Sequence, residues 1–166
     1  RRTRGQRDGS AVAQYCRAPA DEERADTDAA SEQHLLENKG CARWVERTGA
    51  PHKVAGYAAV TLSLKDHRIA PGDATDQQMD LVADWADAYS FGELRVSHEQ
   101  NLILANVKKR DLFAVWEKAK AAGFATPNIG LLTDIIACPG GDFCSLANAK
   151  SIPIALAFQQ RFDDLD

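Results

Sequence analysis

Apolar residues alternate with small or polar ones from Tyr57 to Leu64, which is the pattern of a half-buried β-strand. Leu94–His98 and Asn101–Val107 show the same pattern and predict two further strands. Elsewhere the apolar spacing changes to three or four residues, which is typical of amphipathic helices. One helix is predicted from Asp73 or Thr75 to about Ser90, and a second from Asp111 to Ala122.

The apolar positions of each helix predict the face that it buries. The first helix ends near Gly92 and the second at Gly123, since glycine commonly terminates helices. Trp85 is predicted to lie on the flank of the first helix. The predicted inward residues are Met79, Val82, Ala86 and Tyr89 in the first helix, and Leu112, Val115, Trp116 and Ala119 in the second.

The elements therefore follow the order β-α-β-β-α, with a tight connection at Glu99-Gln100 between the last two strands. This order is most of a ferredoxin-like split unit, an α+β architecture with helices on one face of an antiparallel sheet. Residues 1–33 lack a sustained period and are predicted to be a flexible, solvated arm. The mixed stretch from His34 to Pro51 is interpreted as a lead-in that lays Trp44 against the domain.

After Gly123 we predict a loop over 125–130, followed by the stretch 131–136. The cysteine loop comes next, with the sequence Cys138-Pro139-Gly140-Gly141-Asp142-Phe143-Cys144. We predict a short helix that starts within 142–144 and runs toward Lys150. Ser151 is predicted to cap a further helix over Ile154–Phe162, with Pro153 at an early helical position.

Composition narrows the class of protein. The chain has 166 residues, 45% hydrophobic and 27% charged, which is ordinary for one globular domain with a core. No apolar run reaches the length of a membrane span, and a net charge of −4 gives no general attraction to nucleic acid. The four cysteines are unevenly spread, which favours a reducing, cytoplasmic compartment. Since its only methionine is Met79, we expect the chain to be part of a longer one.

Cys138 and Cys144 are the strongest candidates for chemistry, because the Pro-Gly-Gly between them allows close backbone approach to a bulky ligand. Zinc sites favour two to four residues between cysteines, so five fit zinc poorly. An iron–sulfur cluster normally takes four thiolates, of which this pair would supply two. A disulfide and two inert cysteines remain alternatives. Cys16 and Cys41 are not expected to supply the other two, because 24 residues separate them and Cys16 lies in the predicted flexible arm.

A second candidate lies around Arg95, a permanent cation suited to a carboxylate or an oxyanion. Ser97 shares its strand face, and Gln100 and Asn101 add amide donors at the following turn. The alternative is a solvent-facing strand with polar residues outward. His98 is interpreted as a surface histidine.

Together these stretches resemble the sirohaem-containing nitrite and sulfite reductase family, over about residues 44–160. An Arg-x-Thr-x-x-Gln-Asn-Leu turn in that family is followed by a Cys-x5-Cys loop; here Ser97 replaces the threonine. The matching residues of the turn and loop are Arg95, Gln100, Asn101, Leu102, Cys138, Pro139, Gly140, Cys144, Leu146 and Ala147. Pro71-Gly72-Asp73, Trp44 and Gly56-Tyr57 are similar to family positions too, whereas residues 1–40 do not match.

The resemblance implies a ferredoxin-like half domain over residues 44–124. Residues 125–166 would begin a second α+β domain, which holds sirohaem and a 4Fe–4S cluster, and residues 1–43 are unmatched. It implies Arg95, Gln100 and Asn101 as sirohaem-binding residues and Cys138 and Cys144 as two cluster ligands, with no catalytic residue identified. The family's second cysteine pair and its substrate-binding basic residues are absent, so the isolated chain is expected to be inactive.

The implied activity is the six-electron reduction of sulfite to sulfide or of nitrite to ammonia, with ferredoxin or a flavoprotein reductase as electron donor. Lys150, after the cysteine loop, resembles the residue found in nitrite-reducing relatives. The Pro-Gly-Gly loop resembles relatives that reduce both sulfite and nitrite, and we favour sulfite as the substrate. Two other hypotheses remain: a small iron–sulfur electron-transfer module, and a non-catalytic ferredoxin-like interaction domain.

Overall fold

The alternating strand residues form one antiparallel sheet in the computed structural model, which describes residues 33, 37–66 and 69–163. The strands are β1 (Gly49–Pro51), β2 (Tyr57–Leu62), β3 (Leu94–Val96) and β4 (Leu102–Lys108). Their order in the sheet is β1-β2-β4-β3, and all neighbours are antiparallel. The longest strands, β2 and β4, therefore lie at the centre.

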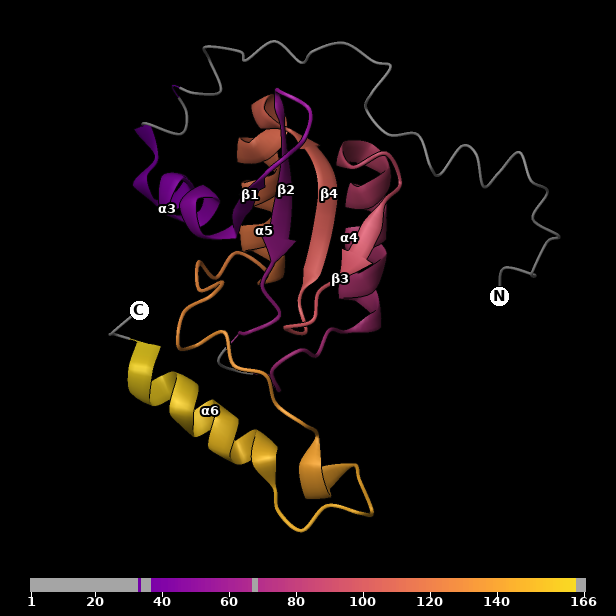
Figure 1. Ribbon diagram of the computed structural model, residues 1–166, viewed down its shortest axis with the longest axis vertical. Helices are drawn as coiled ribbons and strands as arrows, with labels where there is room; N and C mark the ends of the chain where they lie inside the picture. The colour runs from indigo at the N-terminus through magenta and orange to yellow at the C-terminus, as the bar shows by residue number, and fades with distance from the viewer. Residues whose placement is uncertain (1–32, 34–36, 67–68, 164–166) are drawn as a thin grey trace, which may run out of the picture.

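Two helices cover one face of this sheet. They are α4 (Asp76–Tyr89) and α5 (Leu112–Ala122), which lie behind the strands in Figure 1. A third helix, α3 (Lys39–Thr48), packs beside α5 and β2. This arrangement confirms the predicted α+β class and the ferredoxin-like half domain.

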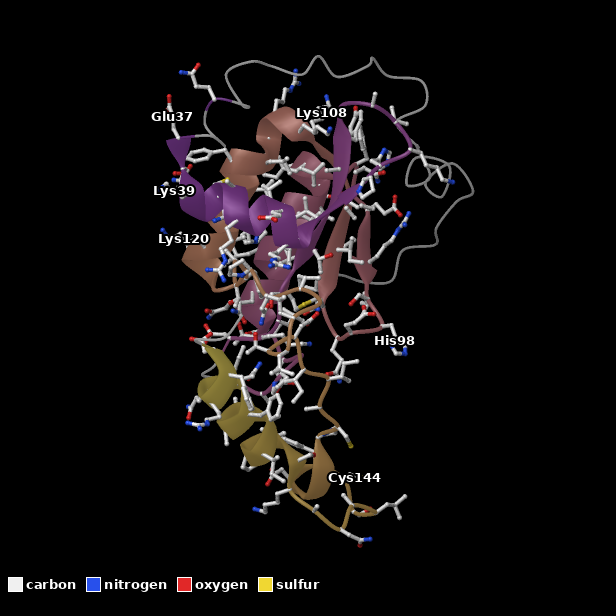
Figure 2. All side chains as sticks on the ribbon, turned by 60° about the vertical axis from the view of Figure 1, so that its left-hand side comes forward. Glu37, Lys39, His98, Lys108, Lys120 and Cys144 are labelled. Carbon is white, nitrogen blue, oxygen red and sulfur yellow. The ribbon has the colours of Figure 1, made fainter. Side chains whose placement is uncertain are left out.

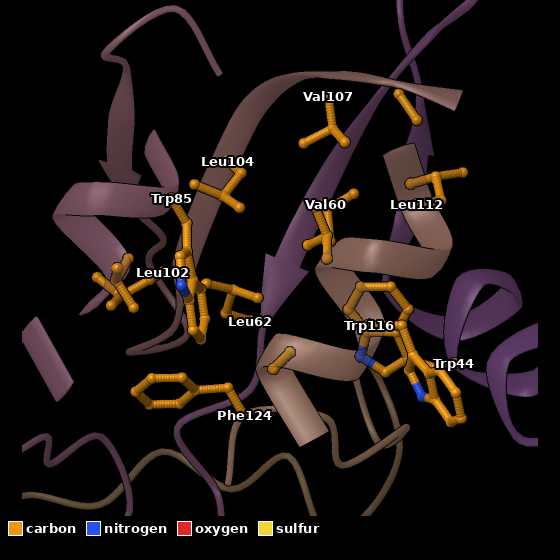
Figure 3. Close-up of a cluster of buried hydrophobic side chains, with 14 of the residues drawn as sticks. Trp44, Val60, Leu62, Trp85, Leu102, Leu104, Val107, Leu112, Trp116 and Phe124 are labelled. Carbon is orange, nitrogen blue, oxygen red and sulfur yellow. The ribbon is translucent and has the colours of Figure 1, made fainter. Parts of the chain in front are cut away.

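The core lies between the sheet and the helices. Figure 3 shows Trp85 beside Leu102 and Leu104 of β4, and Trp116 close to Trp44. Trp44 is completely buried, so the prediction that it packs against the domain is confirmed. Burial of these large side chains is the main driving force for folding of the half domain.

The predicted face of α5 is confirmed, because its buried residues are Leu112, Val115, Trp116 and Ala119. Gly123 ends this helix in the left-handed conformation, with φ of 84°. Helix α4 begins after Thr75, whose side chain accepts a hydrogen bond from the backbone N–H of Gln78 while the Gln78 side chain binds back to the Thr75 N–H. This capping box decides between the two predicted starts.

The predicted face of α4 is partly wrong. Val82 and Ala86 are buried as expected, but Trp85 is only 6% exposed and Met79 is 40% exposed. The apolar stripe is thus rotated toward Trp85, whose ring meets Phe124 edge to face, at a centroid distance of 6.1 Å. A contact from a distant segment therefore sets the phase of this helix.

The C-terminal part differs more from the prediction. The helix expected from 142–144 to Lys150 is absent; the chain forms only a 3-10 turn, η3 (Gly140–Asp142), followed by turns. The backbone N–H of Gly141 donates to the carbonyl of Ala149, so this segment must fold back on itself and cannot extend as a helix.

The last helix, α6 (Ser151–Phe162), is confirmed but starts earlier than predicted. Ser151 is not its cap: the capping position is Lys150, with no side-chain hydrogen bond, and the Ser151 hydroxyl donates to the carbonyl of Cys138. Figure 1 shows α6 below the sheet, away from the other helices.

Buried polar contacts attach the C-terminal segment to the half domain. The hydroxyl of Ser63, just after β2, donates to the Asn128 side chain at 2.8 Å. The Asn128 amide and the Gln159 amide of α6 both donate to the Thr133 carbonyl. Among the described residues no helix has the length and apolarity needed to cross a bilayer.

Candidate functional site

Gly140 forms a hydrogen bond with each of the two cysteines of the loop. Its backbone N–H donates to Cys138 Sγ at 3.4 Å, and its carbonyl accepts from the N–H of Cys144 at 2.9 Å. Hydrogen bonds to cysteine sulfur are one means by which proteins tune iron–sulfur clusters. The loop is therefore internally ordered and carries a donor directed at one sulfur.

Glycine is required at position 140 for two reasons. Its φ is +61°, a conformation that other residues rarely adopt. A Cβ atom there would also collide with the Ser151 hydroxyl and lie 2.8 Å from the Ala149 carbonyl oxygen. The loop thus packs its backbone directly on the start of α6.

The loop presents its sulfurs on the outside of the described structure. Cys138 is exposed and Cys144 partly so, and Figure 2 shows Cys144 at the tip farthest from the sheet. The apolar residues on either side of Cys144 are largely exposed, Phe143 at 79% and Leu146 at 88%. Lys150 pairs with Asp142 across the loop, with its Nζ 3.2 Å from Oδ1.

Arg95 lies at the surface on β3. Its guanidinium forms an ion pair and a hydrogen bond with Glu93, and its side chain is 62% exposed. The Glu93 carboxylate also accepts from the Asn106 amide at 2.8 Å, which fixes the pair against β4. His98 projects from the end of the sheet in Figure 2, in agreement with a surface histidine.

Gln100 and Asn101, the other predicted site residues, hold the segment that precedes Cys138. The Gln100 amide donates to the Ala137 carbonyl, and its Oε1 accepts from the Ala137 N–H, both at 3.1 Å. Asn101, which is 1% exposed, donates to the Asp134 carboxylate and accepts from the N–H of Leu64. Two consecutive residues of one turn, Gln100 and Asn101, therefore connect the candidate site around Arg95 with the segment that leads to the cysteine loop.

Lys65 is a part of this site that the sequence did not indicate. It is completely buried, and its Nζ donates to the carbonyls of Glu99 and Gln100 at 2.7 and 3.0 Å. Burial lowers the pKa of this lysine, an effect that the negative charges of Asp134 and Glu99 oppose. A lysine directly after a strand normally indicates a solvated end, so only the fold reveals this role.

A cavity of about 130 Å³ lies between the turn and the cysteine loop. Its walls come from three segments that are distant in sequence. The lining residues are Ala70, Pro71, Gly72, Asp73, Gln100, Ala137, Pro139, Phe143 and Ile152.

Cys41, the other cysteine that the structure describes, lies in the core and not in this loop. Cys41 is buried in α3, where burial, with a smaller contribution from the charge of Glu117, raises the pKa of its thiol to about 11. Cys16 lies outside the described residues. Across the described part of the chain no group of three or more His, Cys, Asp or Glu side chains is placed to hold a metal ion.

Comparison with known proteins agrees with this geometry. Residues 53–122, which run from just before β2 to the end of α5, match the family described as the nitrite/sulfite reductase ferredoxin-like half domain. Residues 53–122 therefore correspond to a ferredoxin-like half domain of the kind found in the nitrite/sulfite reductase family, as the turn motif around Arg95 suggested.

Several curated relatives are nitrite reductases. The chain is 30% identical to the chloroplastic ferredoxin–nitrite reductase of Oryza sativa over 115 residues, which are 69% of this chain and 18% of that protein. It is 26% identical to the ferredoxin–nitrite reductase of Synechococcus elongatus over 113 residues, 68% of this chain and 21% of the relative. It is 27% identical to the nitrite reductase [NAD(P)H] of Bacillus subtilis over 100 residues, 60% of this chain and 12% of the relative. The match thus spans about a fifth or less of each of these relatives.

Proposed function

We propose that this chain is the part of a nitrite reductase that supplies two of the four ligands of a 4Fe–4S cluster and one wall of a sirohaem site. The observation that carries the proposal is that Gly140 hydrogen-bonds to the Cys138 sulfur and to the Cys144 backbone in one loop, in which Cys138 is exposed and Cys144 partly exposed. The names of the relatives support nitrite, rather than the sulfite that the loop sequence favoured, as the substrate.

The residues present fit half of a cluster site. Two thiolates and an N–H donor to sulfur are characteristic of cluster loops, but the other two ligands would have to come from residues beyond those described. When bound, the cluster and sirohaem would supply electron storage and an iron atom that binds the substrate anion. The chain's own contribution is to hold the two cysteine sulfurs in a fixed loop and to place the Arg95 cation near the cofactor.

Arg95 is the residue proposed to bind a carboxylate of sirohaem. Its guanidinium is exposed, and its partner Glu93 keeps it on the β3 surface until a stronger anionic ligand is present. Gln100 can contribute its second amide hydrogen, since only one hydrogen bond from Nε2 is used by Ala137. Asn101, which is buried and bonded to Asp134, would act by holding the turn.

We also propose a division of the chain into two parts. Residues 44–124 form the half domain, and residues 125–166 begin the domain that holds the cofactors. Because the described residues place only two cysteines in the loop, we propose that the 166-residue chain does not reduce nitrite by itself.

The test is an activity assay on a chain extended until it includes the second cysteine pair that the family resemblance implies. Loaded anaerobically with iron, sulfide and sirohaem, the extended chain should convert nitrite to ammonia with reduced viologen as electron source. Sulfite in place of nitrite tests the substrate, and reduced ferredoxin against a flavoprotein reductase tests the donor. Absence of turnover with both anions in a fully loaded protein would contradict the proposal.

A further inference from the structure

The contact between Gln100 and Ala137 has the geometry of a clamp. One carboxamide both donates to and accepts from the same backbone residue, at 3.1 Å in each direction. Two parallel hydrogen bonds fix orientation as well as distance, which a single bond does not. Ala137 is joined directly to Cys138, so the clamp sets the point from which the cysteine loop starts.

Lys65 fixes the position of the clamp. Its buried ammonium donates to two successive carbonyls of the turn, those of Glu99 and Gln100. An ammonium offers three donors and no acceptor, so it ties backbone oxygens that have no partner in a strand. The backbone at Gln100 is held in a left-handed conformation, with φ of 59°.

The Pro71-Gly72 loop closes the clamp from another side. A Cβ atom at Gly72 would lie only 2.9 Å from the Cβ of Gln100, so the backbone of this loop approaches the Gln100 side chain closely. Gly72 itself is anchored, since its N–H donates to the carbonyl of Leu64 at 2.8 Å. The side chain of Gln100 thus has the backbone of this loop on one side and its two hydrogen bonds to Ala137 on the other.

Further hydrogen bonds hold Cys138 itself. The carbonyl of Cys138 accepts from the Ser151 hydroxyl at 2.5 Å, and its Sγ accepts from the Gly140 N–H. Cys138 is therefore held on its N-terminal side by Gln100, at its carbonyl by α6 and at its sulfur by the loop. A metal ligand shared with other segments needs support of this kind, because its position must hold within about 0.5 Å.

We propose that Gln100 and Lys65 are positioning residues for Cys138: Lys65 fixes the turn, and the Gln100 carboxamide transfers that placement to the residue before the sulfur. This inference rests on the proposed function for its purpose, but the clamp itself is testable without any cofactor.

The first measurement is site-resolved hydrogen exchange at the Ala137 amide of the 166-residue chain. Gln100→Leu removes the clamp with little change of volume, and Lys65→Met removes the donor beneath it. Gln78→Leu is the matched control, because Gln78 also donates to a backbone carbonyl, that of Ala122. We expect exchange at Ala137 to accelerate about tenfold, the factor that about 1.4 kcal/mol gives, in both test variants and not in the control.

The second measurement is loss of iron to a chelator from the reconstituted, extended chain, together with the EPR spectrum of its cluster. Gln100→Leu should release iron about 10- to 100-fold faster and change the spectrum, as loss of an outer-shell partner does elsewhere. Gln78→Leu should match the unmodified protein in both.

The outcomes separate the two proposals. Equal Ala137 exchange in Gln100→Leu and Gln78→Leu would overturn the clamp even if a cluster forms. Unchanged iron release and an unchanged spectrum in Gln100→Leu would overturn the positioning role. If no cluster forms in the unmodified extended chain while Ala137 exchange does respond, the clamp stands and the proposed function fails. Should Lys65→Met not fold, Gln100→Leu still decides the matter, because Gln100 is not a core residue.

Discussion

Gly140 lies so close to Ser151 that no side chain fits between them. The hydroxyl and backbone N–H of Ser151 occupy the space that a Cβ at position 140 would need. Backbone contact of this kind makes the cysteine loop and the start of α6 one unit. The loop is thus fixed by packing as well as by its own hydrogen bonds.

Gly140→Ala should therefore detach the loop from α6. We expect the hydrogen bond from the Gly141 N–H to the Ala149 carbonyl to open, with faster exchange at Gly141. Gly130→Ala is the control, since Gly130 also has a positive φ but no atom lies within 4 Å of its Cβ position. The control should show only the cost of the backbone conformation, about 1–2 kcal/mol. Equal effects of both changes at Gly141 would argue against the packing.

Trp116→Ala tests the core. Trp116 is 8% exposed and packs against Phe113 at a centroid distance of 5.6 Å, and the Nζ of Lys120 lies over its ring, 5.1 Å from the centroid. Its removal should lower the free energy of unfolding by about 3–5 kcal/mol in urea denaturation. Met79→Ala, on the exposed side of α4, should cost much less. A loss below about 1 kcal/mol for Trp116→Ala would be inconsistent with its buried position.

The cysteines should differ in reactivity. Alkylation at pH 8 followed by peptide mass spectrometry should label Cys138 first and Cys144 next, because they are exposed and partly exposed. Cys41 should react only on unfolding, since it is buried and its pKa of about 11 leaves little thiolate. Rapid labelling of Cys41 in the folded chain would contradict its place in the core.

Lys65 predicts an unusual response to alkaline pH. Its folded-state pKa lies below the ordinary 10.5, chiefly because of burial, so on raising the pH the folded chain releases this proton before the unfolded chain does. The unfolded state then binds more protons, and the contribution of Lys65 to stability rises with pH between the lowered value and 10.5. Cys41 acts oppositely between 9.0 and about 11, because its folded pKa is raised.

Comparison with Lys65→Met isolates the lysine, since the variant keeps Cys41. The unfolding free energy of the unmodified chain minus that of Lys65→Met should increase with pH over this window. A difference that falls with pH would show that the lysine is stabilised, not penalised, in its charged form.

The half domain was largely predictable because its signals are local. The four buried residues of α5 follow one helical face, and Thr75 with Gln78 forms a recognisable helix start. Helix α3 was missed because its ten residues include few large apolar groups, and its formation depends on placing Trp44 in the core. The helix expected after Cys144 was predicted wrongly, because the Gly141 N–H bonds to the Ala149 carbonyl and folds the segment back. Helix propensities carry no information about such a contact.

The site shows the same limit. The sequence identified Gln100, Asn101 and the cysteine loop as candidates, but it gave no means of seeing that they touch. Gln100 and Ala137 are 37 positions apart, and Lys65 reaches the turn from 34 positions away. Such contacts arise only when the sheet brings the end of β2 beside the turn between β3 and β4.

The most direct test of the central claim is EPR after anaerobic reconstitution with iron, sulfide and sirohaem. We predict a cluster coupled to sirohaem in the extended chain and in its Cys41→Ala variant, and none in Cys138→Ser, in Cys144→Ser or in the 166-residue chain alone. A cluster that persists without Cys138 and Cys144 would contradict the account. A stable cluster in the 166-residue chain would instead indicate that Cys16 and Cys41 take part, as an electron-transfer module would require.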